Sequence, residues 1–230
     1  MRLTTLDQLI AARQQKRAVV LITNLQDGTQ SLYFQDGAVA GTALTEVQRS
    51  LAQQALQSNQ YLLAENATLF LQPYNPPLRL IIIGAVHISQ ILAAMATLCD
   101  YQVTVVDPRQ AFAAAARFPD VELNTDWPDA ALTALQPDAR TAIVTLTHDP
   151  KLDDPALRCA LQSDAFYIGA LGSRKTQQAR FNRLAEHGYT EAQQARIHGP
   201  VGLDLGAVSP AEIAIAIMAQ ITQCLHRRTA

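Results

Sequence analysis

From Arg79 onward, short and almost wholly apolar runs alternate with amphipathic stretches of helical length. This alternation limits the fold more than any other feature, because strands that are apolar on both sides need a covering layer on each face. A parallel sheet with helices on both faces meets that need. We therefore expect an α/β fold with a mostly parallel sheet, and we place its strands at five runs: Leu80–Ile83, Val103–Val106, Val121–Leu123, Ala142–Leu146 and Phe166–Ala170.

Residues 1–72 show a different pattern, that of a small α+β domain. Strand-like runs at 18–25 and 29–34 flank Asp27-Gly28, a pair that favours hairpin turns. Apolar residues at helical spacing follow at 44–56, and 61–70 is typical of a second hairpin. Prolines then interrupt regular structure. We therefore expect three parts: a domain at 1–72, a proline-rich linker at 73–78 and the α/β domain at 79–230.

Charge and composition exclude several functional classes. Eighteen basic and twenty acidic residues give a net charge of −2, so there is no uniform field to hold nucleic acid or an anionic membrane. The most apolar helical stretch, 213–219, is far shorter than the roughly 20 residues that cross a bilayer. The three cysteines (Cys99, Cys159 and Cys224) are too widely spaced for a zinc site or a disulfide framework. We expect a cytoplasmic protein without an export signal or a covalent nucleophile.

The first candidate loop is Gly84-Ala85-Val86-His87, which joins the first strand directly to a helix. Asp107 follows the next strand, at the spacing from Gly84 at which an acid bonds a ribose in Rossmann folds. The dinucleotide fingerprint, however, requires glycine where Val86 stands. Two interpretations stay open for this loop. Gly84 either contacts a phosphate or only makes the turn, and His87 either binds an anion at the helix start or lies at the surface.

The second loop, Thr147-His148-Asp149 with Lys151, leaves the fourth strand. In open α/β sheets, ligands lie outside the carboxyl ends of the strands where the strand order reverses, so these side chains are placed to reach one. His148 and Asp149 together with Asp153 resemble metal ligands, but no second histidine follows at helical spacing. The alternative is turn chemistry, in which the aspartates only break the chain and cap a helix.

Two short sequences predict where helices begin. Asp154-Pro155 combines a capping carboxylate with a proline suited to a first turn. Ser209-Pro210-Ala211-Glu212 adds a capping box to the same signal. We expect one helix to start at each sequence.

The third loop, residues 169–174, contains the strongest signal for an anion site. Its two glycines let the backbone approach a ligand closely, and Ser173 is placed to cap the helix that follows. Arg174 and the next lysine stand at the positive end of the helix dipole, where cations are unfavourable unless an anion lies nearby. The alternative is a solvated basic surface that Arg180 and Arg183 continue.

The fourth loop, residues 197–206, holds three glycines within eight residues. Such glycine density predicts unusual backbone geometry. His198 and Asp204 either form a polar pair that faces the same crevice, or the loop is only a tight connection to the helix at Ser209.

These motifs taken together resemble the XdhC/CoxI family, accessory proteins of xanthine dehydrogenase and carbon monoxide dehydrogenase. The resemblance implies a Rossmann-like, doubly wound domain behind a small N-terminal domain, in a homodimer. Two departures stand out: the family's usual G-A-G-H has Val86 at its third position here, and residues 1–72 lack the cysteine of many members. The matching runs are 84–87, 105–109, 117–119, 146–153, 167–174 and 198–204.

The family resemblance also implies a function. A member would bind molybdenum cofactor (molybdopterin), assist its sulfuration and insert it into an apo molybdenum hydroxylase related to xanthine dehydrogenase, with a cysteine desulfurase as a further partner. Such a protein is a chaperone rather than a catalyst. We assign cofactor contacts to residues of the four loops and their neighbours: Gly84, Ala85, Val86, His87, Asp107, Arg109, Thr147, His148, Asp149, Lys151, Gly169, Leu171, Gly172, Ser173, Arg174, His198, Gly199 and Asp204.

Two other functions stay open at this point. An NAD(P)-dependent oxidoreductase would use Asp107 to bond the ribose or Arg109 to meet a 2′-phosphate, although Val86 weakens that interpretation. An interaction module without a ligand would use the same fold to dock the target enzyme.

Overall fold

The computed structural model describes residues 3–64 and 66–227. The chain divides into two compact units between Pro76 and Pro77, within the segment 73–78. Each unit has its own sheet and its own buried apolar core. Among the described residues, no helix combines the length and the apolar character needed to cross a membrane.

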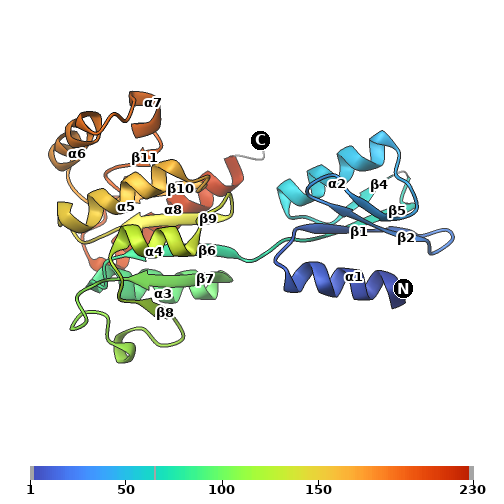
Figure 1. Cartoon of the computed structure of the whole chain (residues 1–230), viewed down its shortest axis with the longest axis horizontal. Helices are drawn as coiled ribbons and strands as arrows, with labels where there is room; N and C mark the ends of the chain where they lie inside the picture. The colour runs from blue at the N-terminus through green and yellow to red at the C-terminus, as the bar shows by residue number, and fades with distance from the viewer. Residues whose placement is uncertain (1–2, 65, 228–230) are drawn as a thin grey trace. The chain divides into compact units, whose positions relative to one another are not determined.

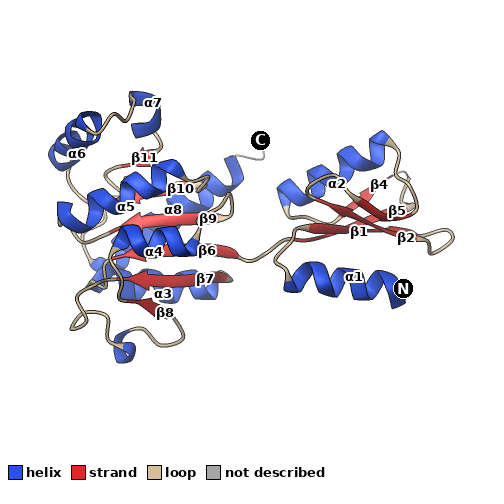
Figure 2. Ribbon diagram, in the orientation of Figure 1, coloured by secondary structure: helices blue, strands red, loops and turns tan. Residues whose placement is uncertain are grey.

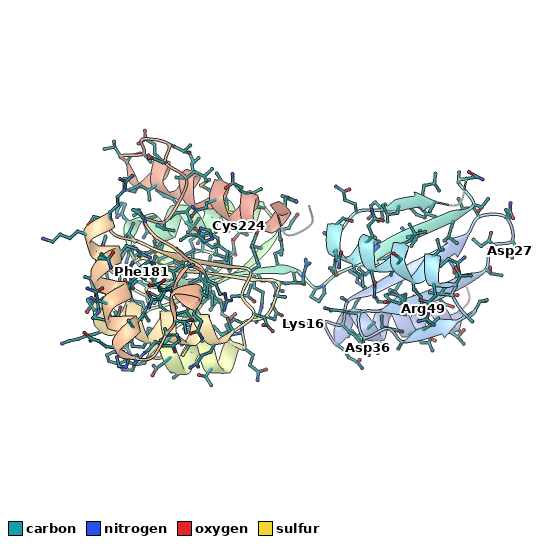
Figure 3. The ribbon with its side chains drawn as sticks, turned by 90° about the horizontal axis from the view of Figure 1, so that it is seen from above. Lys16, Asp27, Asp36, Arg49, Phe181 and Cys224 are labelled. Carbon is teal, nitrogen blue, oxygen red and sulfur yellow. The ribbon has the colours of Figure 1, made fainter. Side chains whose placement is uncertain are left out.

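The first unit is a five-stranded sheet in the order β3-β2-β1-β5-β4, with a helix on each face (Figure 1). β1 and β2 pair antiparallel, and so do β4 and β5, which confirms both expected hairpins. Asp27 lies at the β1–β2 turn (Figure 3). The elements are α1 (Leu3–Gln14), β1 (Val19–Asn24), β2 (Gln30–Phe34), β3 (Val39–Gly41), α2 (Glu46–Ser58), β4 (Leu62–Ala64) and β5 (Leu69–Tyr74).

Alternation along β1 divides the core of this unit into two layers. Val20 and Ile22 pack with α2, whereas Val19 and Leu21 pack with α1. Thr45 caps α2 through a capping box with Gln48. The sheet is therefore covered on both faces, and α1 is an element that the sequence interpretation did not include.

The second unit is a six-stranded sheet in the order β11-β10-β9-β6-β7-β8, and all neighbouring strands run parallel. The chain winds outward from β6 in one direction and from β9 in the other, which is the Rossmann arrangement. Its elements are β6 (Leu78–Ile83), α3 (His87–Leu98), β7 (Tyr101–Val106), a 3₁₀ turn η1 (Ala115–Arg117), β8 (Glu122–Asn124), α4 (Pro128–Leu135), β9 (Thr141–Thr145), α5 (Pro150–Gln162), β10 (Tyr167–Ala170), α6 (Arg174–Glu186), α7 (Glu191–Gln194), β11 (Ile197–His198) and α8 (Pro210–Arg227).

Helices cover both faces of this sheet (Figure 2). Leu80 and Ile82 of β6 belong to the core layer under α3 and α8. Ile81 and Ile83 belong to the opposite layer, under α4, α5 and α6. Both sets are buried, which explains why the strand is apolar at every position from 80 to 83. The expected α/β architecture with a parallel sheet is confirmed.

The five expected strands of the second unit are present, each shifted by at most two residues at an end. The capping box at Ser209 and Glu212 is also confirmed, because Ser209 Oγ accepts the Glu212 N–H and the Glu212 carboxylate accepts the Ser209 N–H. The helix start at Asp154-Pro155 is wrong. α5 begins at Pro150, capped by Asp149, and continues through Pro155.

Candidate functional site

The loops that follow the parallel strands meet at the carboxyl edge of the sheet. Backbone hydrogen bonds join them in pairs: Leu146 N–H donates to Ile83 O at 2.9 Å, and Leu171 N–H donates to Thr145 O at 2.9 Å. In the same way, Val201 N–H donates to the carbonyl of Ala170, the last residue of β10. The loops after β6, β9, β10 and β11 therefore form one edge beside the point where the strand order reverses.

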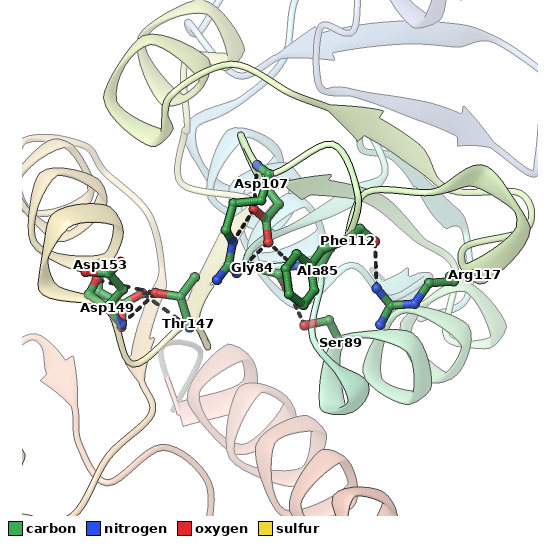
Figure 4. A network of polar contacts seen from close by, with 10 residues as sticks. Gly84, Ala85, Ser89, Asp107, Phe112, Arg117, Thr147, Asp149 and Asp153 are labelled. Carbon is green, nitrogen blue, oxygen red and sulfur yellow. Dashed lines mark hydrogen bonds and ion pairs between the residues drawn. The ribbon is translucent and has the colours of Figure 1, made fainter.

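Asp107, at the end of β7, is fully buried and is held by four hydrogen bonds (Figure 4). Its carboxylate accepts Ala85 N–H at 2.8 Å, Arg109 N–H at 2.9 Å, and two bonds from the Arg109 guanidinium at 2.9 and 2.8 Å. Burial raises the pKa of this carboxyl, but the bonds from Arg109 and Ala85 outweigh burial and hold the pKa below its usual value.

These bonds bear on the expected ribose contact. A carboxylate has about four lone-pair sites, and internal donors fill those of Asp107. Arg109 is likewise bonded to Asp107. This bond raises the pKa of the Arg109 guanidinium, and the negative charges of Asp149 and Asp153 raise it further. In this arrangement Asp107 and Arg109 build the loop and leave no free carboxylate oxygen for a nucleotide sugar.

Gly84 is required by close packing between two loops. Its φ is +107°, and a Cβ at this position would lie 2.6 Å from the Thr147 methyl carbon Cγ2. The buried Ser89 hydroxyl donates to the Gly84 carbonyl. Val86 is the N-cap of α3 without a side-chain cap, and His87 is exposed in the first turn. The turn interpretation thus accounts for Gly84, and His87 lies at the surface.

The loop after β9 is organised by Thr147. Its hydroxyl donates to Asp153 Oδ1 at 2.6 Å and accepts Asp149 N–H at 3.0 Å. Asp149 in turn caps α5 by accepting Lys151 N–H at 2.9 Å. His148 has a φ of +60° and is exposed, as is Lys151. Capping therefore explains Asp149 rather than Asp153, and two polar side chains of the loop face solvent.

The loop after β10 ends at the N-terminus of α6. Ser173 caps the helix by accepting Thr176 N–H at 3.2 Å. Gly172 has a φ of +141°, and Arg174 is exposed in the first turn. Gly169 is a packing residue, because a Cβ there would lie 2.6 Å from Val201 Cγ2.

The alternative of a solvated basic surface on α6 is wrong for its second half. Arg180 is only 2% exposed, with one guanidinium nitrogen donating to the Leu171 carbonyl at 2.9 Å. Arg183 forms a two-bond ion pair with Asp154. The exposed cations of this helix start are therefore confined to Arg174 and Lys175.

The loop after β11 does not form the expected pair. The His198 ring stacks on Tyr167, with centroids 4.9 Å apart and planes 11° apart, and its Nε2 lies 3.6 Å from Cys224 Sγ. Cys224 belongs to α8 (Figure 3), so His198 faces the helical layer. Burial lowers the pKa of this imidazole. Asp204 is exposed and separate from it.

The structure sorts the candidate residues by burial. Those that are buried build the framework, whereas those that are exposed are accessible to solvent. Buried are Gly84, Ala85, Asp107 and Gly169; half-buried are Val86, Arg109, Thr147, Asp149, Leu171, Gly172, His198 and Gly199; exposed are His87, His148, Lys151, Ser173, Arg174 and Asp204.

Four buried polar residues at this edge were not among the candidate site residues predicted from the sequence. They are Thr145, Asp153, Gln177 and Arg180. The sequence indicates Asp153 only as a cap or a metal ligand. Gln177 and Arg180 are three residues apart on α6, a spacing that places both on one helix face, and this was the available signal.

Exposed cations stand in the first turns of two helices that begin at this edge, Lys151 on α5 and Arg174 on α6. Helix N-termini and cations both favour anions, so the edge suits an anionic group better than a cationic one. Within 3–64 and 66–227, no group of three or more potential metal-ligating side chains lies together.

Comparison with known proteins assigns the chain to a protein family. Residues 80–221 match the family model described as the XdhC Rossmann domain. Over 164 residues the chain is 31% identical to a Bacillus subtilis (strain 168) protein named as a probable subunit of xanthine dehydrogenase, covering 71% of this chain and 48% of that protein. It is 28% identical over 155 residues to the molybdenum cofactor insertion chaperone PaoD of Escherichia coli (strain K12), covering 67% and 42%.

Two further similarities complete the comparison. An uncharacterized protein of Escherichia coli (strain K12), YqeB, is 32% identical over 160 residues, which is 68% of this chain and 29% of that protein. The chain thus spans less than half the length of these curated relatives. A crystal structure of a xanthine dehydrogenase from Bacillus halodurans has a similar fold, with a TM-score of 0.74 and 24% identity over 98% of this chain and 65% of that one.

Proposed function

Since this chain belongs to the XdhC family, we propose that it binds molybdenum cofactor and serves as an accessory factor in the maturation of a xanthine dehydrogenase-type molybdoenzyme. The names of two relatives support the proposal, because one refers to xanthine dehydrogenase and the other to cofactor insertion. In this role the cofactor is cargo, and the protein has to hold it reversibly.

The observation that carries the proposal is the N-terminus of α6. Ser173 caps it, Gly172 brings the backbone close, and Arg174 and Lys175 are exposed beside the positive end of the dipole. A molybdopterin carries a phosphate, and an exposed guanidinium next to unpaired helix N–H groups is suited to hold it. Arg174 would bond the phosphate oxygens, and the Ser173 hydroxyl can donate while its oxygen caps the helix.

The remaining loops supply the other contacts of this proposal. The loop 84–87 would form one wall, and His148 and Lys151 would lie over the polar part of the ligand because both are exposed at the same edge. His198 has no part in these contacts, since its ring is stacked inside the helical layer. Asp107 and Arg109 act by fixing the loop that carries Ala85.

Finer parts of the proposal concern sulfur and assembly. We propose that the protein assists sulfuration of the bound cofactor, with a cysteine desulfurase as the sulfur source, and that it works as a homodimer in the cytoplasm. Mixing the purified protein with a desulfurase and with an apo molybdenum hydroxylase, followed by size-exclusion chromatography, tests both partners and the dimer.

Cofactor retention tests the main proposal. Molybdenum cofactor released from a molybdoenzyme is mixed with the protein, the complex is re-isolated, and pterin fluorescence is measured after oxidation. Arg174→Ala should weaken retention by about 10- to 100-fold, the range for losing a charge-assisted hydrogen bond of roughly 1.5–3 kcal/mol. Lys16→Ala removes a positive charge from the first unit and should leave retention unchanged.

Two results would contradict the proposal. Equal retention by wild type and Arg174→Ala would show that Arg174 does not contact the phosphate. It would favour an interaction module that docks the target enzyme without a ligand. Saturable binding of NADH or NADPH without affinity for molybdopterin would favour an oxidoreductase, despite the internal bonds that occupy Asp107.

A further inference from the structure

Among the described residues of the second unit, four buried polar side-chain atoms have no hydrogen-bond partner: Thr145 Oγ1, Asp153 Oδ2, Gln177 Nε2 and Arg180 Nε. Buried polar groups in proteins are almost always paired, and leaving one unpaired costs about 1–3 kcal/mol. Over the described part of the chain the same condition holds for one other side-chain atom, Gln30 Oε1, in the first unit. Four such atoms at one edge of one sheet therefore call for a ligand or solvent that completes them.

The four side chains belong to one layer, between the end of the sheet and helices α5 and α6. Thr145 is two residues after Ile143 on β9, so its side chain shares the face that these helices cover. Leu171 links the strand to α6, because its N–H bonds to Thr145 O and its carbonyl accepts from Arg180.

The same layer holds the remaining two groups. The Arg180 guanidinium donates to Gln177 Oε1. Burial raises the pKa of Asp153, and the bond from Thr147 to Oδ1 and the charge of Arg180 oppose that shift. We call Thr145, Asp153, Gln177 and Arg180 the inner polar cluster. All four are at least 95% buried.

The chemistry of the inner polar cluster specifies the kind of guest. Asp153 and Arg180 have opposite charges, so the cluster has no net charge with which to hold a phosphate or a metal ion. The two unpaired N–H donors, from Gln177 and Arg180, require acceptors from any ligand bound there. One unpaired carboxylate oxygen, from Asp153, needs a donor, and the Thr145 hydroxyl can serve either way. A neutral group with an N–H beside a C=O, that is a lactam edge, satisfies this set.

The inner polar cluster lies directly behind the loops to which we assign the cofactor. Thr147 bonds Asp153 from the loop after β9. On the opposite side, Gln177 packs so closely against Gly199 that a Cβ there would clash with its amide group. Asp153 also acts electrostatically on Arg109, which follows β7. The inner polar cluster is thus in direct contact with the loops after β9, β10 and β11.

We propose that the inner polar cluster recognises the lactam edge of a planar heterocycle, with Asp153 accepting from the ring N–H and with Gln177 and Arg180 donating to the ring carbonyl. This inference rests on the proposed function, because a pterin carries such an edge, and it assigns that edge to residues separate from the phosphate contact at Arg174. The phosphate contact then positions the ligand, and the inner polar cluster determines which ring systems bind.

Fluorescence titration of the whole chain with two probes tests this assignment. Pterin (2-amino-4-oxopteridine) has the lactam edge, whereas 2,4-diaminopteridine replaces its carbonyl by an amino group and removes the ring N–H. Wild type should bind pterin at least 10-fold more tightly than the diamino probe, because the diamino edge leaves the donors unpaired. No preference, or no saturable binding of pterin, overturns the proposal.

Substitutions in the inner polar cluster test which side chains produce the preference for pterin over the diamino probe. Asp153→Asn and Thr145→Val are nearly isosteric, and each should reduce pterin affinity about 10-fold while leaving the weak binding of the diamino probe unchanged. Asp164→Asn, on an exposed residue, is the matched control. If Asp153→Asn fails to fold, Thr145→Val still decides, since its hydroxyl has no protein partner to lose.

The outcomes separate this inference from the proposed function. Retention of molybdenum cofactor that depends on Arg174 but not on Thr145 or Asp153 overturns the inference and leaves the proposed function standing. A crystal structure with only ordered water against the four atoms, in the presence of saturating pterin, would also overturn it.

Discussion

Replacing Arg109 by alanine should strongly destabilise the second unit, because it leaves the charge of Asp107 buried with too few partners. Asp107 is fully buried, and the variant removes two of its four hydrogen bonds while keeping those from Ala85 N–H and from the backbone of residue 109. Breaking a buried ion pair from one side costs about 3–5 kcal/mol. Since the Arg109 side chain is 37% exposed and water can enter its place, we expect about 3 kcal/mol.

The measurement is urea unfolding followed by tryptophan emission. Trp127 is the single tryptophan of the chain, and it lies in the second unit, so its signal reports the unit that contains the pair. Adding Asp107→Asn to the Arg109→Ala variant removes the stranded charge and should recover part of the loss.

The pH dependence supplies an independent test of the same reasoning. In the wild type the pKa of Asp107 is lowered, so its contribution is complete above the unfolded value near 3.8 and is lost as pH falls through the folded pKa. In Arg109→Ala, burial without the guanidinium should raise the pKa, so protonation relieves the cost. The difference in unfolding free energy between the two proteins should therefore shrink from pH 7 to pH 4.5.

Two results would refute the reasoning. A loss within about 0.5 kcal/mol of wild type, the size typical of surface substitutions, would mean that the pair contributes nothing net. A loss that stays constant with pH would mean that it comes from packing rather than from the charge.

Two further predictions concern the same unit. Gly84→Ala should destabilise it by about 3 kcal/mol or more, because a Cβ would lie 2.6 Å from the Thr147 methyl carbon in backbone with φ of +107°; Gly188 has φ of +85° with open space around it, so Gly188→Ala should cost less in the same Trp127 assay. Burial lowers the pKa of His198, so stability should fall as pH decreases from 7 through the ordinary histidine value, and His198→Phe should flatten that dependence over pH 5 to 7; an unchanged slope would contradict the burial argument.

The sheet was largely predictable because its physical cause is local. Strands such as β6 are apolar along most of their length, and a strand covered on both faces explains that pattern. β11 was not predicted, since it contains two residues only and forms by pairing with β10. The start of α5 differs from the expected one by five residues because three aspartates offer similar caps, and the fold selects Asp149.

The side-chain roles were harder to predict because they depend on distant partners. The sequence leaves Arg180 open as a surface cation, yet it is buried beside Asp153, which is 27 positions earlier in the sequence. His198 was expected to pair with Asp204, but its neighbours are Tyr167 and Cys224. A sequence pattern shows that a charge exists, whereas burial and pairing follow only from how the helices pack.

Thr147 has a consequence for how this edge can move. Its methyl group packs against Gly84 at the end of β6, while its hydroxyl is tied to Asp153 of α5. One side chain thus contacts both halves of the doubly wound sheet. Displacing the segment after β9 would therefore break the packing of Thr147 against the segment after β6 as well.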